Sequence, residues 1–314
     1  MESCGGSHVN GKSFFLLFLL AALWGGSFLF ICMGVSAFGP IPLMAVRVAI
    51  AASFLLAALL YQHGIPGLRN LYIYLGPLCV VGMLNAALPF ILFAYAELTI
   101  AAGLTSVIAA TAPLWGALIG RVWFKEHLGL SRTIGLLIGF AGVLLLVWHQ
   151  VSISVGKLEE APNPLPILLA ILASLVAALM YGVSVNYTSR YLSQLNSMQI
   201  ATGSMLSSAV VLLPFAILQW PSVPVPWQAW AVVTALGIAC TAIAFIVYFH
   251  LIATTEPAYA ISVMFLVPIF GVLWGVLFLQ EEVSPDMLAS GSVILIGVLL
   301  STGLVSRLYA KWKS

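Results

Sequence analysis

Residues 110–120 read ATAPLWGALIG, and residues 265–275 read FLVPIFGVLWG. Pro113 in the first stretch corresponds to Pro268 in the second, 155 residues later. The glycines that follow, Gly116 and Gly120, correspond to Gly271 and Gly275 at the same spacing. Both stretches lie in apolar segments long enough to cross a bilayer. Apolar segments that are interrupted by Pro and Gly at matching positions of two halves predict an internal repeat of membrane-spanning helices.

The composition excludes a water-soluble domain. Of the 314 residues, 62% are hydrophobic and 6% are charged, and the mean hydropathy is +1.14. Such a chain lacks the polar residues that would cover its exterior in water. The net charge of +2 does not indicate a nucleic-acid partner. The four cysteines show no zinc-site or redox spacing, so neither a metal nor a cofactor is expected.

The hydrophobic segments predict an all-α integral membrane protein with ten transmembrane helices. We place the spans at 14–34, 41–61, 72–95, 101–123, 131–149, 165–187, 198–219, 228–250, 258–279 and 287–306. The first segment has no cleavage site typical of a signal peptide, so it is expected to be retained. Five units follow: a tail (1–13), a first module (14–149), an external linker (150–164), a second module (165–306) and a basic tail (307–314).

The basic residues predict the orientation. If both termini are cytoplasmic, Lys157 alone lies outside and nine Lys and Arg residues lie inside. The nine are Lys12, Arg69, Arg121, Lys125, Arg132, Arg190, Arg307, Lys311 and Lys313. This bias follows the positive-inside rule. Each module has an odd number of spans, so the two modules are expected to be inverted relative to one another. The predicted location is the cell (inner) membrane, with both termini cytoplasmic.

The chain resembles the EamA-type modules of the drug/metabolite transporter superfamily over residues 14 to 306. The resemblance is carried by the two paired Pro-Gly stretches with a glutamate after each, by Trp24-Gly25-Gly26-Ser27-Phe28 and by Arg47 in LMAVRVAIAA. It implies two antiparallel five-helix modules around a central cavity, and movement of amino acids or other small metabolites, often outward. The second module departs from the first: Leu179-Met180-Tyr181 stands opposite Trp24-Gly25-Gly26, and Thr202 stands opposite Arg47.

Pro113 and Pro268 each fall near the middle of a span, where proline frees a backbone carbonyl and kinks the helix. We interpret them as hinges that frame a midplane site, and a static bend that improves packing is the alternative. Arg47 is the basic residue placed within a span. It is a candidate for gating or solute contact, and the alternative is a side chain that snorkels to the outer surface.

Polar and aromatic residues on inward-facing helices are the candidates for lining the cavity, because they combine stacking with hydrogen bonding. They are Trp24, Ser27, Asn85, Thr111, Tyr181, Thr241 and Tyr248. The alternatives are interface anchors for the aromatic residues and bonds to their own helix for the hydroxyls. The acids are expected outside the interior. Glu97 falls at a span end and Glu281 in a turn, where a cap or an inter-module contact is expected, so no buried proton relay is predicted.

These features favour a secondary transporter that exports amino acids or related small metabolites across the plasma membrane by alternating access. A non-transporting scaffold or sensor is the alternative. An intramembrane enzyme is disfavoured, because the one Asp, Asp286, lies in a loop and neither GxSG nor HExxH occurs. No GxxxxGK[ST] loop occurs either, so the chain is not expected to use ATP. The expected partners are a small solute and the bilayer. The oligomeric state is left open, and a monomer is compatible with the sequence.

Overall fold

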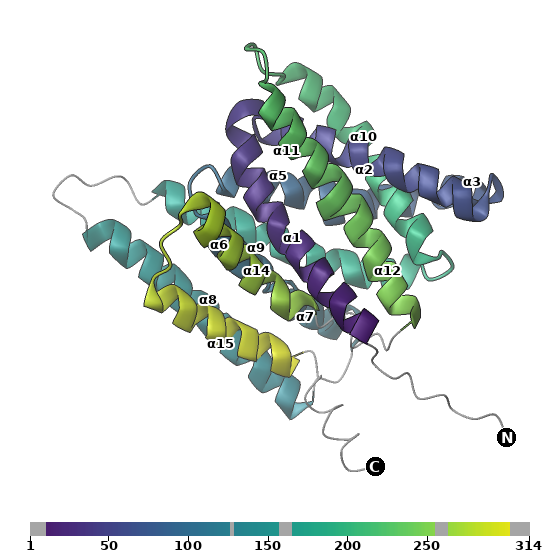
Figure 1. The fold of residues 1–314 in the computed structure, drawn as a ribbon. Helices are drawn as coiled ribbons and strands as arrows, with labels where there is room; N and C mark the ends of the chain where they lie inside the picture. Colours follow the sequence, from purple (N-terminus) through teal and green to yellow (C-terminus); the bar gives the residue numbers. More distant parts are fainter. Residues whose placement is uncertain (1–10, 126–128, 157–164, 255–262, 302–314) are drawn as a thin grey trace.

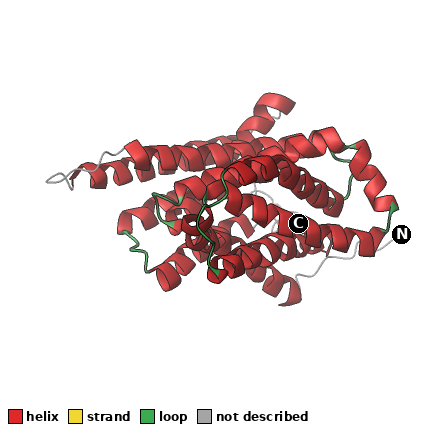
Figure 2. Cartoon of the chain, turned by 90° about the horizontal axis from the view of Figure 1, so that it is seen from above, coloured by secondary structure: helices red, strands yellow, loops and turns green. Residues whose placement is uncertain are grey.

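The computed structural model describes residues 11–125, 129–156, 165–254 and 263–301, and every regular element in this part is helical (Figures 1 and 2). The elements are α1 (Gly11–Phe38), α2 (Pro40–His63), α3 (Pro66–Ile73), α4 (Leu75–Gly82), the π-helix η1 (Met83–Ala87), α5 (Leu88–Ala96), α6 (Ala102–Ala109), α7 (Ala112–Phe124), α8 (Leu130–Gly156), α9 (Leu165–Tyr191), α10 (Ser197–Leu218), α11 (Trp227–Gly237), the π-helix η2 (Ile238–Ile243), α12 (Ala244–Thr254), α14 (Val263–Leu279) and α15 (Pro285–Ser301).

Eight helical stretches in the described residues are long and apolar enough to cross a membrane. Three of them are composite: α4, η1 and α5 form one, α6 and α7 another, and α11, η2 and the start of α12, as far as Tyr248, a third. The ninth and tenth expected spans correspond to α14 and α15, which are apolar but only 17 residues long. The chain is therefore a multi-pass membrane protein, and the number of ten spans stays a prediction.

Glycine and proline separate the first helices. Gly39 alone lies between α1 and α2, with a φ of 78° that residues with a Cβ rarely adopt. Pro40 then opens α2, where its fixed φ suits a first turn. Gly64 ends α2 with a φ of 60°, two residues before Pro66. The chain thus turns sharply at both ends of α2, and this places α2 against α1.

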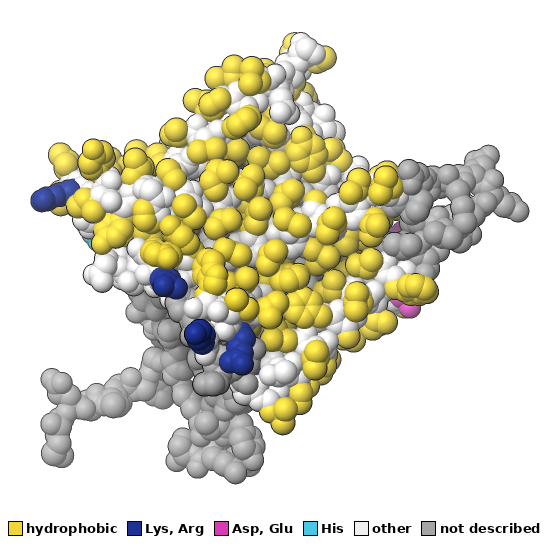
Figure 3. Space-filling view, turned by 180° about the vertical axis from the view of Figure 1, so that it is seen from behind, with side chains coloured by type: hydrophobic (Ala, Val, Ile, Leu, Met, Phe, Trp, Pro, Cys, Tyr) yellow, Lys and Arg dark blue, Asp and Glu magenta, His cyan; other side chains and the backbone are white. Residues whose placement is uncertain are grey.

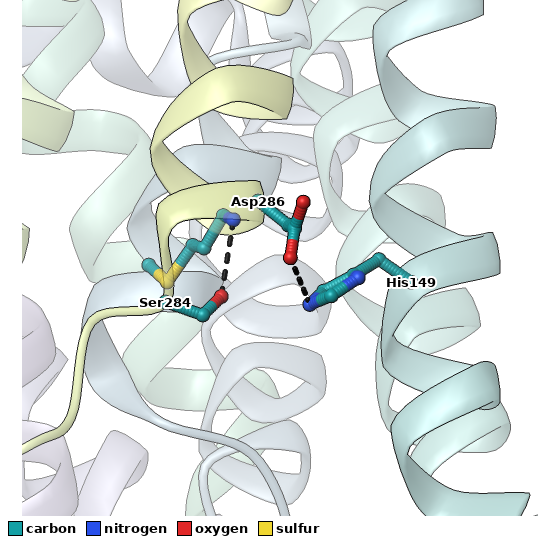
Figure 4. Close-up of polar contacts among 4 residues, drawn as sticks. His149, Ser284 and Asp286 are labelled. Atoms are coloured by element: carbon teal, nitrogen blue, oxygen red, sulfur yellow. Dashed lines mark hydrogen bonds and ion pairs between the residues drawn. The ribbon is translucent and has the colours of Figure 1, made fainter. Parts of the chain in front are cut away.

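The start of α15 has the residues that favour a helix N-terminus (Figure 4). Ser284 caps the helix by accepting a hydrogen bond of 3.1 Å from the backbone N–H of Met287. Asp286 lies in the first turn, where a negative charge favours the helix dipole. Its Oδ2 atom lies 3.2 Å from Nε2 of His149 on α8, so this contact joins the two helices near their ends.

Helices that are distant in sequence pack in pairs. α8 lies along α15, α2 along α10, and α1 along α14, and in Figure 1 α8 and α15 form one side of the bundle. Small residues permit the closest approaches, as expected. A Cβ on Gly142 of α8 would lie 2.8 Å from the backbone N of Ile294 on α15, and Gly297 contacts the backbone of Gly139 directly. The α8–α15 pair is therefore joined backbone to backbone.

The outer surface is apolar over most of the face in Figure 3. Large exposed hydrophobic residues belong to helices from both halves, including Leu144 on α8, Leu213 on α10 and Phe278 on α14. On this face the visible Lys and Arg side chains gather along one edge, and acidic side chains appear at the opposite edge (Figure 3). An apolar belt with basic residues at one end is typical of a protein that spans a membrane.

Candidate functional site

Arg47 of α2 lies in the interior and is 4% exposed. Its Nε atom donates a hydrogen bond of 3.0 Å to Oγ1 of Thr241 on η2, and its Nη2 atom donates one of 3.3 Å to Oγ of Ser27 on α1. The guanidinium also lies over the ring of Phe90 on α5, 3.7 Å from the centroid. The structure thus brings three of the residues chosen from the sequence into one cluster, which we call the Arg47 cluster (Ser27, Arg47, Phe90 and Thr241).

The geometry of Arg47 decides between two expectations. A snorkelling side chain would reach the surface, but this guanidinium is enclosed by α1, α5 and η2, so the snorkelling alternative is wrong. Among the described residues it forms no ion pair with a carboxylate, and its partners are two neutral hydroxyls, the Met44 sulfur and a ring. A buried cation without an anionic partner is costly and is found mainly at functional sites. Its contact with a solute stays a prediction.

Two groups of aromatic residues surround the cluster. Trp24 on α1 stacks with Tyr248 on α12, with ring centroids 5.2 Å apart. Tyr181 on α9 contacts the ring of Phe93 on α5 at 5.9 Å, and Phe93 in turn contacts Phe28 at 5.7 Å. Trp24, Tyr181 and Tyr248 are half-buried between helices of different modules. They are therefore not isolated anchors on the outer surface.

Asn85 and Thr111 take different positions. Thr111 is buried at the break between α6 and α7, and its hydroxyl donates a hydrogen bond of 2.7 Å to the carbonyl of Ile108. That bond within its own helix is the alternative foreseen for hydroxyl residues. Asn85 is half-buried on η1, and no described contact joins it to the Arg47 cluster. The structure does not bring these two residues together with the others.

The two π-helical segments were not foreseen. η1 begins at Met83 and η2 begins at Ile238, so they recur at the same spacing of 155 residues as the Pro-Gly stretches. η2 carries Thr241, whose hydroxyl donates to the carbonyl of Leu236 at 2.9 Å while it accepts from Arg47. π-Turns inside α-helices are frequent at functional sites because they free backbone groups and redirect side chains. Sequence patterns carry little signal for such a turn.

The two prolines interrupt their helices differently. Pro113 lies in the first turn of α7, after the break that separates α7 from α6. Pro268 lies inside α14, which continues through it. Each is positioned where a backbone hydrogen bond is missing. A hinge at either proline stays a prediction.

Close glycine contacts reveal a register that the sequence alignment missed. A Cβ on Gly25 of α1 would lie 2.7 Å from Cβ of Phe270 on α14, and a Cβ on Gly182 of α9 would lie 2.6 Å from N of Gly116 on α7. Gly25 and Gly182 therefore occupy matching places. This register sets Tyr181 opposite Trp24, two residues away from the pairing that a uniform spacing gave.

The carboxylate of Glu281 joins the two halves. It accepts hydrogen bonds from the backbone N–H of Ala102 at 2.6 Å and of Gly103 at 2.9 Å, at the start of α6. The expectation of a cap or an inter-module contact is thus confirmed for Glu281, which makes both at once. Its counterpart Glu126 lies outside the described residues.

The expectation that acidic side chains lie outside the interior is wrong for Glu97. This residue follows the end of α5, as expected, but it is only 6% exposed. Both carboxylate oxygens are buried, and neither has a hydrogen-bond partner among the described residues. Groups from distant parts of the chain, Cys32 on α1, Arg47 on α2 and Glu281, lie near the carboxylate. The sequence shows a span end, but it does not show what covers it.

Two surface hollows lie away from this cluster. One is lined by α11 and the start of η2, from Trp230 to Ala239, and the other by residues of α3, α4 and α10. None of the cavity candidates lines either hollow. Trp24 packs on Tyr248, and Ser27 and Thr241 bind Arg47, so a central cavity stays a prediction.

Comparison with known proteins gives a consistent result. The model of the EamA-like transporter family matches the chain twice, over residues 11–148 and 168–303. An uncharacterized transporter of Archaeoglobus fulgidus is 25% identical over 94% of this chain and 98% of its own length. The uncharacterized inner membrane transporter YedA of Escherichia coli K12 is 28% identical over 91% of this chain and 90% of its own. A solved crystal structure has the same fold, with a TM-score of 0.65 at 22% identity, over 95% of this chain and 99% of that one.

Proposed function

The chain belongs to the EamA-like transporter family, and we propose that it is a secondary transporter that exports amino acids or related small metabolites by alternating access. The solute binds at the Arg47 cluster, between Trp24 and Tyr248 on one side and Tyr181 on the other. The observation that carries this proposal is the buried guanidinium of Arg47, whose described partners include no carboxylate.

Arg47 fits the carboxylate group of an amino acid. A guanidinium presents paired N–H donors that match the two oxygens of a carboxylate. In the described structure, the hydroxyls of Thr241 and Ser27 accept hydrogen bonds from it at 3.0 and 3.3 Å. A solute carboxylate can replace such neutral acceptors and neutralise the buried charge. The aromatic rings nearby offer surfaces for an apolar side chain.

Alternating access requires two halves that move against one another around this site. We propose two inverted modules, 14–149 and 165–306, with ten spans and both termini in the cytoplasm. The helix pairs support this, because exchanging the modules leaves the pairs α2–α10 and α8–α15 unchanged and converts α5–α9 into α1–α12. The equal spacing of η1 and η2 also supports it. In Figure 1, α1 begins and α15 ends toward the same end of the bundle.

Counterflow in proteoliposomes tests the proposal. Vesicles are loaded with one unlabelled amino acid or metabolite at a time, and entry of the labelled compound is measured. Arg47→Lys keeps the charge but loses the paired donors, so its half-saturating concentration for a carboxylate solute should rise. One hydrogen bond to a charged group contributes about 1.5–3 kcal/mol, which corresponds to roughly 10- to 150-fold in affinity. Ser53→Ala on the exposed side of α2 is the matched control, since Ser53 bonds its own helix at Ala49.

The outcomes separate the alternatives. Counterflow of a carboxylate solute that weakens in Arg47→Lys and not in Ser53→Ala supports the proposal. No counterflow across a broad panel would favour a scaffold or sensor. Growth in the presence of toxic amino-acid analogues tests the direction, because overproduction of an exporter gives resistance and overproduction of an importer gives sensitivity.

A further inference from the structure

The Glu97 side chain is an acidic group that the proposed solute site does not use. Its two oxygens are buried and have no hydrogen-bond partner among the described residues. The backbone of Cys32 on α1 comes near the carboxylate without meeting the geometry of a hydrogen bond. An ionised carboxylate in such a place would lose its hydration without replacement, at a cost of several kcal/mol. A neutral carboxyl group avoids most of that cost.

The charged and titratable groups that face Glu97 come from three elements. They are the Glu281 carboxylate after α14, the Arg47 guanidinium of α2 and the Cys32 thiol of α1. Glu281 is an acceptor for two backbone amides, which fits an anionic carboxylate, and a second negative charge beside it is unfavourable. Arg47 favours a negative charge on Glu97, but its guanidinium donates to Thr241 and Ser27 and forms no ion pair with Glu97.

We infer that Glu97 is the proton-binding group of this transporter: it carries a proton in the closed arrangement described here and releases it when the surrounding helices separate. This inference rests on the proposed transport function. In the transfer, the carboxyl O–H bond breaks, the proton passes to water on the open side, and the carboxylate that remains is hydrated. No other reactant is needed.

The position of Glu97 couples its hydration to movement of the modules. The residue stands at the end of α5, and four residues separate it from Ala102, where α6 begins. The start of α6 is held by Glu281 from the other half of the chain. When the halves separate there, this contact breaks and water reaches the carboxyl group beside it. Proton release and opening of the site are then the same event.

Infrared spectroscopy of the purified protein tests the proton directly and needs no solute. A neutral buried carboxyl group gives a C=O band that is separate from that of a carboxylate, and ¹³C-labelled glutamate shifts it. The chain has only nine acidic residues, which makes assignment practical. The expected result is a band at neutral pH that is lost in Glu97→Gln and kept in Glu281→Gln. Should Glu97→Gln fail to fold, Glu97→Asp assigns the band, because an aspartate is not ¹³C-labelled.

A transport measurement tests the coupling. A solute identified by counterflow is used with an imposed pH gradient, and its accumulation is compared with exchange at equal pH. Glu97→Gln should keep exchange and lose accumulation, because the neutral amide permits movement of the modules but carries no proton. Accumulation driven by a Na⁺ gradient alone, or full pH-driven accumulation in Glu97→Gln, would overturn the inference.

The two measurements can refute the transport function and the proton-binding role independently. If no solute moves in any panel, the proposed function fails, and the infrared band still decides whether Glu97 holds a proton. If solutes move but the wild-type protein shows no carboxyl band that depends on residue 97 at neutral pH, the proton-binding role is refuted while the transport function stands.

Discussion

Removing the Glu281 carboxylate should loosen the start of α6. In the structure this side chain accepts hydrogen bonds from the N–H groups of Ala102 and Gly103 at 2.6 and 2.9 Å. Both donor residues are buried, so water does not replace the lost acceptor in the closed protein. Glu281→Ala leaves two buried amides unsatisfied and removes a negative charge from a helix N-terminus.

The size of the effect follows from those two bonds. A hydrogen bond to a charged acceptor contributes about 1.5–3 kcal/mol, and two bonds to one group do not add fully. We therefore expect the free energy of local opening to fall by about 2–4 kcal/mol in Glu281→Ala, which is roughly a 30- to 700-fold loss of protection. Glu281→Gln retains one acceptor oxygen and should lose about half as much free energy.

Hydrogen exchange measured by mass spectrometry on peptides from residues 98–110 reports this opening. The start of α10 serves as an internal control, since its cap is independent: Asn196 accepts from the N–H of Gln199 at 2.9 Å. Protection should fall at α6 in the order wild type, Gln variant, Ala variant, and stay constant at α10. Equal exchange at α6 in all three proteins would refute the assignment of Glu281 as the acceptor that holds the start of α6.

Three further predictions concern the site and the seam between the modules. Trp24→Ala and Tyr181→Ala should each reduce counterflow by roughly 5- to 30-fold while the thermal midpoint changes little. Normal flux in both variants would show that the solute does not bind between these residues. Pro113→Ala and Pro268→Ala should slow turnover by stiffening their helices, with unchanged solute affinity, and unchanged rates would reduce the prolines to packing features. Gly297→Leu should place a side chain against backbone and lower the stability by about 1–3 kcal/mol, and an unchanged thermal midpoint would contradict the tight α8–α15 contact.

The helices themselves could be predicted because hydrophobic length is a strong signal. Every expected span has a helical counterpart in the described residues. Local chemistry also accounts for the start of α15 after Ser284, since a serine followed by proline and aspartate satisfies the first turn. Both signals depend on neighbours in the sequence.

The site was harder to predict because it depends on distant residues. Arg47 was recognised as a charge within a span, but its partner Thr241 lies 194 positions away, and nothing in the sequence pairs the two. The burial of Glu97 depends on helices from elsewhere in the chain. The correspondence of Trp24 and Tyr181 was obscured by a shift of two residues, which only the glycine contacts reveal.

The π-helical turns of η1 and η2 bear on the origin of the two halves of the chain. A π-turn arises when one residue is inserted into an α-helix, and such turns are rare and frequently found at functional sites. Two separate insertions would have had to fall at equivalent positions, Met83 and Ile238, by coincidence. A single insertion in a half-length ancestor would account for both positions at once.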